Sequence, residues 1–225
     1  MNNLKFELRL GAVFLVLFLA FWLYLNPGVV TGKLTAQEIA ANMAVAEKLP
    51  FPGGEKPALM KRLREWQETD DGKPVYMLNL MRYYPELKQF EGALESNKLS
   101  PKDSNQYYEK LAMAMLTKLG GYALYAGTPQ GANLMEFEPA LDNWSRLLVI
   151  RYPSRRDFLK LVTDPAYHPI EPYKMMALQV VLTPTTPEIV LPELSSLVGA
   201  LLLAIFFAVR WWRAANSRRI RCSPS

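Results

Sequence analysis

The sequence has a single histidine, His168, and a single cysteine, Cys222. One histidine cannot build a histidine-rich zinc site, and one cysteine excludes an internal disulfide and a cysteine pair for metal binding. The chain also lacks a His-Glu-x-x-His motif, a phosphate-binding glycine loop and a nucleophile elbow. These absences exclude the commonest metal and nucleotide sites, so we expect no metal and no cofactor.

Charge is missing from two long segments. Leu10 to Leu25 is an unbroken apolar run, and a second charge-free run extends from Leu194 to Val209. About 20 residues cross the hydrocarbon core of a bilayer, so each run predicts a transmembrane helix. The alternative for the first run is a cleaved signal peptide. Because no Ala-x-Ala site follows it, an uncleaved anchor is favoured.

Basic residues are concentrated at the two ends of the chain. Seven of the 26 Lys and Arg residues lie in the tails beyond the apolar runs, whereas Thr31 to Glu188 holds 19 basic and 19 acidic residues. The positive-inside rule therefore predicts a two-pass protein of the inner (plasma) membrane, with both termini cytoplasmic and the central domain periplasmic. The bilayer is the expected partner of these cations, because they can meet anionic headgroups. Nucleic acid is not expected to bind.

These observations divide the chain into seven segments. They are a cytoplasmic tail (1–9), a transmembrane helix (10–29), a helical extension (33–72), an α+β domain (73–184), a linker (185–193), a second transmembrane helix (194–212) and a basic cytoplasmic tail (213–225). In the extension, Thr35 and Glu38 form a capping box that opens one helix. A second helix carries an apolar stripe that we expect to pack on the domain: Leu59, Leu63 and Trp66.

The central domain is predicted to alternate strands with helices. Apolar, β-rich runs predict strands at residues 75–82, 122–126, 146–152 and 178–183. Ser100 and Ser154 are expected helix caps, the second opening a helix over residues 155–162 that resumes to about 177. The first of these helices is expected to bury one stripe: Tyr108, Leu111, Met115 and Leu119. The order β-α-β-β-α-β predicts a ferredoxin-like α+β fold.

Two corner motifs carry a family resemblance. They are Tyr152-Pro153-Ser154 and Asp164-Pro165-Ala166-Tyr167, within the stretch Trp144 to Ala177. With these motifs about half the chain resembles an uncharacterised family of the dimeric α+β barrel superfamily, whose fold is ferredoxin-like. The resemblance implies this fold and a homodimer, but no chemistry, because that family has no established activity. His168 and Lys174 stand where the family commonly has a polar residue such as an amide and an arginine, and transmembrane helices are not part of its pattern.

His168 and Tyr167 are the candidate catalytic residues. The superfamily includes cofactor-free oxygenases and isomerases, in which His168 would act as a general base beside a tyrosine. The alternative is that His168 is an ordinary polar residue of a helix.

Arg82 and Arg151 are the candidate ligand-binding residues, with Asn79 beside them. We expect their two strands to be adjacent and parallel, so that both guanidinium groups lie near the helix start at Ser154. A guanidinium matches a carboxylate in bidentate geometry, so the expected ligand is a small organic acid. The alternative is that both arginines form salt bridges within the protein. The acidic partners would be Glu136, Glu138 or Asp157.

The sequence therefore predicts a membrane-anchored ligand-binding or interaction module outside the cytoplasm. The alternative is a cofactor-free enzyme acting on a small molecule. Because the predicted helices can cover only one sheet face, the other face is expected to pair with a second copy.

Overall fold

The computed structural model describes residues 2–49, 55–90, 92–95, 98–132, 134–135, 143–188 and 193–221. The chain forms two compact units, one made of Met1–Leu25 with Glu188–Ser225 and the other of Asn26–Pro187. The expected linker at 185–193 and the basic tail at 213–225 lie partly outside the described residues. Glu136 and Glu138, the acids named as alternative partners of the arginines, lie wholly outside them.

The first unit is a pair of helices, α1 (Asn2–Leu25) and α8 (Leu194–Arg221). The segments Lys5–Leu25 and Leu194–Ala214 are long and apolar enough to cross a membrane. The helices pack against each other, with Phe14 and Phe206 meeting edge to face at 6.4 Å between ring centroids. Close packing also involves Gly199, where an added Cβ would lie 2.9 Å from the ring of Phe18.

The second unit begins with three helices, α2 (Gly28–Thr31), α3 (Ala36–Ala46) and α4 (Lys56–Glu68). The predicted capping box is present at the start of α3, where Thr35 and Glu38 each accept a hydrogen bond from the other's backbone N–H. Leu63 and Trp66 of α4 pack against a cluster of buried side chains. The cluster comprises Leu34, Ile39, Met43 and Leu159. The predicted packing of the helical extension on the domain is therefore confirmed.

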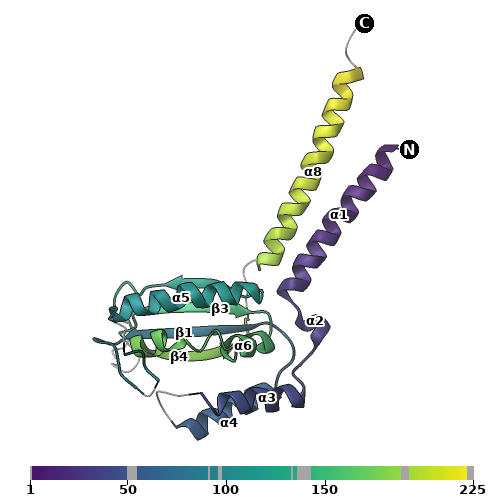
Figure 1. The fold of residues 1–225 in the computed structure, drawn as a ribbon. Coiled ribbons are helices and arrows are strands. Elements are labelled where there is room, and N and C mark those ends of the chain that lie inside the picture. The colour runs from purple at the N-terminus through teal and green to yellow at the C-terminus, as the bar shows by residue number, and fades with distance from the viewer. Residues whose placement is uncertain are drawn as a thin grey trace. The chain divides into compact units, whose positions relative to one another are not determined.

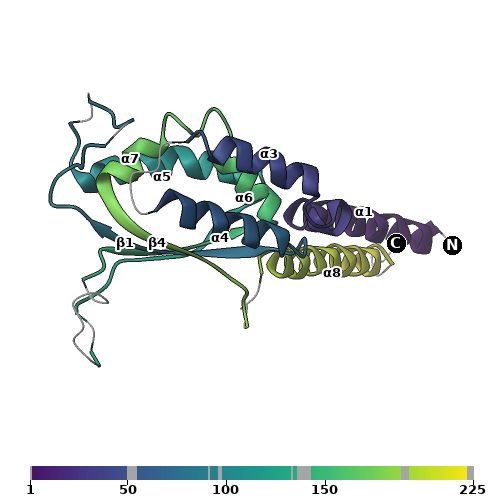
Figure 2. The same cartoon turned by 90° about the horizontal axis from the view of Figure 1, so that it is seen from below.

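A four-stranded antiparallel sheet forms the centre of this unit. Its strands are β1 (Val75–Tyr83), β2 (Tyr122–Gly127), β3 (Arg146–Tyr152) and β4 (Leu178–Thr185), in the spatial order β2-β3-β1-β4. Helix α5 (Pro101–Lys118) connects β1 to β2, and α6 (Arg155–Val162) with α7 (Glu171–Ala177) connects β3 to β4. Helices α3 to α7 lie on one side of the sheet (Figures 1 and 2). The mixed α+β class is confirmed.

The two faces of the sheet differ because alternate side chains point to opposite sides. Met77, Asn79 and Met81 face the helices and are buried. The residues between them face the other side, which no described helix of this unit covers (Figure 2). Register places these open-face residues together across the strands: Leu78, Leu80, Leu147, Val149 and Val181.

The main core lies between the sheet and α5, α6 and α7. Its buried members are Val75, Met77, Tyr108, Ala112, Leu116, Tyr152, Leu161 and Tyr167. Helix α5 does not bury the stripe expected from its sequence. Ser104, Asn105, Tyr108, Ala112 and Leu116 are its buried residues, whereas Leu111, Met115 and Leu119 are only partly buried. Of the predicted stripe, Tyr108 is buried, Met115 and Leu119 are partly buried against the main core, and Leu111 lies outside that core.

Candidate functional site

A cleft of about 1030 Å³ lies on the helix side of the sheet. Helices α3 and α4 form one wall, α5 and α7 form another, and strands β1, β3 and β4 form the floor. Much of the lining is apolar: Leu59, Met60, Leu63, Trp66, Met77, Ile150 and Phe158. A cleft of this size, apolar with a few polar groups, is the usual shape of a small-molecule site.

Lys174 is a polar residue of the cleft lining. Its ammonium group donates a hydrogen bond of 3.1 Å to Oδ1 of Asn79 and lies 5.3 Å from the ring centroid of Tyr108. Asn79 is held in place because its Nδ2 donates to the carbonyl of Met77 at 3.1 Å. Burial lowers the pKa of Lys174 to about 8, although Glu109 and Glu171 act in the opposite direction.

Two carboxylates accompany this lysine and differ in their partners. Glu109 accepts a bidentate ion pair from Arg146, with distances of 2.9 and 2.8 Å, and a further hydrogen bond from Asn105. Glu171 lies one helical turn before Lys174, and burial raises the pKa of its carboxyl group. Within the described part of the chain, Glu171 forms no ion pair at or below 4.0 Å.

Tyr167 lines the cleft as half of a buried pair. Its hydroxyl lies 2.7 Å from the hydroxyl of Tyr108, and burial raises the pKa of both phenols. A phenol that ionises with such difficulty and is already hydrogen-bonded is a poor general base at neutral pH. The pair packs edge to face, so its direct effect is on packing between α5 and the segment before α7.

His168 does not line the cleft. Its side chain is partly buried, and Nε2 is buried with no hydrogen-bond partner among the described residues. The arrangement proposed for catalysis, with His168 and Tyr167 facing one substrate, is therefore not assembled at this cleft. No group of three or more His, Cys, Asp or Glu side chains able to hold a metal occurs in the described ranges either.

Arg82 and Arg151 do not form a common site, and the expectation of parallel neighbouring strands was wrong. Strands β1 and β3 are antiparallel, with Arg151 opposite Tyr76 and Arg82 opposite Gln179 of β4. Since Tyr76 and Arg82 are six residues apart on one strand, the arginines are separated by about 20 Å. Strand β3 lies between β1 and β2 and runs antiparallel to both.

Each arginine is engaged locally at its own end of the sheet. The Arg151 Nη2 donates to Oδ1 of Asn26 at 2.7 Å, and the side chain is 1% exposed. Arg82 donates to the carbonyl of Asn143 at 3.3 Å and stacks over Trp144. Only Asn79, the third predicted ligand residue, lies in the cleft.

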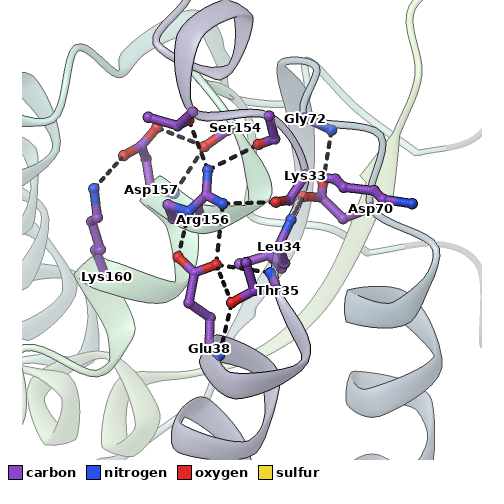
Figure 3. Close-up of polar contacts among 12 residues, drawn as sticks. Lys33, Leu34, Thr35, Glu38, Asp70, Gly72, Ser154, Arg156, Asp157 and Lys160 are labelled. Atoms are coloured by element: carbon purple, nitrogen blue, oxygen red, sulfur yellow. Dashed lines mark hydrogen bonds and ion pairs between the residues drawn. The ribbon is translucent and has the colours of Figure 1, made fainter.

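The start of α6 is occupied by groups of the protein itself (Figure 3). Ser154 caps the helix as predicted, accepting from the backbone N–H of Asp157 and donating to its carboxylate at 2.7 Å. Arg156 binds the carboxylate of Glu38, in the first turn of α3, at 2.7 Å. It also donates to the hydroxyl of Thr31 and to the carbonyls of Gly32 and Lys33. The carboxylate of Asp157 thus takes the place where an external anion was expected.

The grouping of Lys174, Glu109 and Glu171 was not predicted from the sequence. One signal was available: Glu171 and Lys174 are spaced three residues apart in a short helix that also carries Met175, Met176 and Ala177. Charged residues on a largely apolar helix must find partners or a cavity. Asn79 could not be joined to them, because it is 95 residues away from Lys174 in the chain.

Comparison with known proteins gives the fold without a function. No protein-family model matches the chain, and no curated protein matches it. Two of the solved structures that match are crystal structures of one protein. The methylated RPA0582 protein is 20% identical, with a TM-score of 0.50 over 61% of this chain and 94% of that one. The RPA0582 protein from Rhodopseudomonas palustris, described as of unknown function, gives 20% identity and a TM-score of 0.49 over 62% and 98%. At this identity the likeness to the first structure shows a shared fold and nothing more.

Proposed function

We propose that this protein is a membrane-anchored ligand-binding module whose α+β domain lies outside the cytoplasm and holds a small molecule in its cleft. The observation that carries the proposal is the cleft itself, about 1030 Å³ in volume, apolar over much of its lining and lined also by Lys174. A structural core would fill such a space, since protein interiors are normally close-packed.

The proposed orientation has support from the helix pair. Helices α1 and α8 are antiparallel, since Glu7 lies 3.5 Å from Arg210 and Gly199 lies beside Phe18 (Figure 1). Two antiparallel spans place both termini on one side, and the basic tails favour the cytoplasm for that side. A cysteine introduced at Gly131, which has open space around it, would then react with a membrane-impermeant maleimide in intact spheroplasts.

We further propose a ferredoxin-like dimeric barrel built by two copies of the domain. The strand order β2-β3-β1-β4 and the helices on one sheet face support this fold. The open face supports the dimer, because Leu78, Leu80, Leu147, Val149 and Val181 form an apolar area on it and a second copy would present the same surface in return. Val181 and Tyr125 on this face are 42% and 57% exposed. Joining two such faces would remove this apolar surface from water.

Val181→Lys is expected to weaken the dimer of the full chain by roughly 30-fold, because the proposed interface would have to bury an unpaired ammonium group. Leu182→Lys is the matched control. It is the next residue of β4 and is 44% exposed against 42% for Val181, but it points to the opposite side of the sheet. Light scattering of the detergent-solubilised chain measures the association. Equal dimer populations in the two variants would rule out this face as the interface.

Ala46→Trp is expected to weaken binding of an uncharged apolar probe, octanamide, by at least roughly tenfold, since Ala46 lines the cleft and the indole would fill part of it. Ala44→Trp is the same change on the same helix at an exposed position outside the cleft, and it should bind like wild type. Equilibrium dialysis of the full chain in lipid nanodiscs, with empty discs subtracted, measures the dissociation constant. If wild type shows no saturable binding, the proposed function is wrong.

A further inference from the structure

Lys174 retains unused hydrogen-bonding capacity inside the cleft. An ammonium group has three N–H donors. Among the described residues its only hydrogen-bond acceptor is Asn79 Oδ1, at 3.1 Å, and its other close neighbour is the face of the Tyr108 ring. A partly buried cation with donors left over is stabilised by any acceptor that enters the cleft, because a buried polar group without a partner is costly.

The other charges of the cleft are predominantly positive. Its ionisable lining residues comprise four cations and two acids: Lys56, Arg62, Lys88, Lys174, Glu109 and Glu171. Glu109 is already neutralised by its bidentate pair with Arg146. Glu171 is the remaining acid. The cations of the lining therefore outnumber the acids, which favours an anionic ligand.

The apolar walls define the rest of the ligand. Besides Lys174, the lining includes Val180 and Leu182 of β4 and Leu59 and Met60 of α4. These side chains offer no strong hydrogen bonds to a polar molecule such as a sugar or an amino acid. They match a hydrocarbon or aromatic body, which gains about 25 cal/mol for each Å² removed from water.

We propose that the ligand is an amphipathic organic acid, whose carboxylate binds the ammonium group of Lys174 and whose apolar body lies between α4 and β4. This inference rests on the proposed function and specifies the class of molecule that the same cleft takes. Asn79 acts as a positioning residue, because its Oδ1 fixes one Lys174 N–H and leaves the others directed to the ligand.

The pH dependence follows from the groups that face Lys174. Glu109 and Tyr108 face it from α5, Glu171 from its own helix, and Asn79 from β1. The pKa of Lys174 is about 8 in the empty cleft, so the cation that the anion needs is lost as the pH rises through 8. Ionisation of Glu171 acts in the same direction by repelling the anion. Affinity for a carboxylate should therefore fall with rising pH, while affinity for a neutral probe should not change.

The test compares labelled octanoate with octanamide on the full chain in lipid nanodiscs, by equilibrium dialysis with empty discs subtracted. Wild type is expected to prefer octanoate, and Lys174→Met should weaken octanoate binding about ten- to hundredfold while preserving octanamide binding. Lys160→Met is the control, because Lys160 pairs with Asp157 outside the cleft. If Lys174→Met fails to fold, the wild-type pH profile decides, with the affinity for octanoate falling progressively as the pH rises above about 8 and the affinity for octanamide constant.

Two results would overturn the inference without contradicting the proposed function. One is equal binding of octanoate and octanamide by wild type, and the other is octanoate binding that Lys174→Met or a rise in pH leaves unchanged. Absence of binding for both probes would instead remove the proposed function, and the inference with it.

Discussion

Arg156→Met is expected to lower the free energy of unfolding of the domain by about 3 kcal/mol, because the substitution removes several charge-assisted hydrogen bonds at once. The guanidinium group of Arg156 joins α6 to the segment that enters α3, binding the Glu38 carboxylate and three groups at residues 31–33 (Figure 3). Its side chain is 11% exposed, so water cannot fully replace these partners. Urea unfolding of the full chain in detergent, followed by tryptophan fluorescence, measures the loss.

Two further variants separate geometry from charge. Arg156→Lys retains the charge but cannot reach all these acceptors from one nitrogen, so we expect an intermediate loss. Arg64→Met removes a cation from the exposed face of α4 and should change stability by less than about 0.5 kcal/mol. Losses of equal size for Arg156→Met and Arg64→Met would show that the hydrogen bonds contribute nothing.

The same contact predicts an acid-side dependence of stability. The hydrogen bond from Arg156 lowers the pKa of Glu38 from 4.5 to about 2. Because the folded-state pKa is the lower one, Glu38 stabilises the fold fully above pH 4.5, and this contribution disappears as the pH falls toward 2. The Arg156→Met variant should therefore lose less stability than wild type between pH 5 and pH 3. If the free energy of unfolding fell by the same amount in the two proteins between pH 5 and pH 3, this account would be contradicted.

The strands and helix starts of the domain could be predicted from its sequence, because the sequence signals for them are short-range. The four strands appear at the predicted runs, with ends that differ by at most two residues. Thr35, Ser100 and Ser154 cap the helices at which they were expected, since each cap depends on a hydrogen bond to a residue three positions ahead. Such contacts need no knowledge of the rest of the fold.

The candidate site could not be predicted in the same way, because its contacts join distant parts of the chain. Lys174 meets Asn79 across 95 residues, and Arg146 meets Glu109 across 37. The error at Arg82 and Arg151 had a related cause. Each arginine was placed correctly at the carboxyl end of its strand, but their distance depends on the relative direction of two strands, which the path of the chain through the whole sheet determines.

In helix α5 the buried face could not be recognised from the sequence, because several of its residues are small or polar. Its buried side includes Ser104, Asn105 and Ala112, which contribute little to a hydrophobic pattern. Ser104 is held there by a 2.7 Å hydrogen bond to the carbonyl of Tyr173, and Asn105 by its bond to Glu109. The larger apolar residues at Leu111 and Met115 therefore indicated a stripe rotated away from the true one.

Leu116→Ala is expected to lower the free energy of unfolding by about 3 kcal/mol, through lost burial and the cavity that remains. Leu116 is 1% exposed and packs closely against the turn after α5, since a Cβ added at Gly121 would meet its Cδ1 at 2.2 Å. Leu111→Ala is the matched control: the same change, on the same helix, at a partly exposed position outside the main core. Its expected loss is below about 1.5 kcal/mol, because less apolar surface returns to water. Urea unfolding of both variants in the full chain compares the two stripes directly, and a larger loss at Leu111 than at Leu116 would mean that the stripe indicated by the sequence is the buried one.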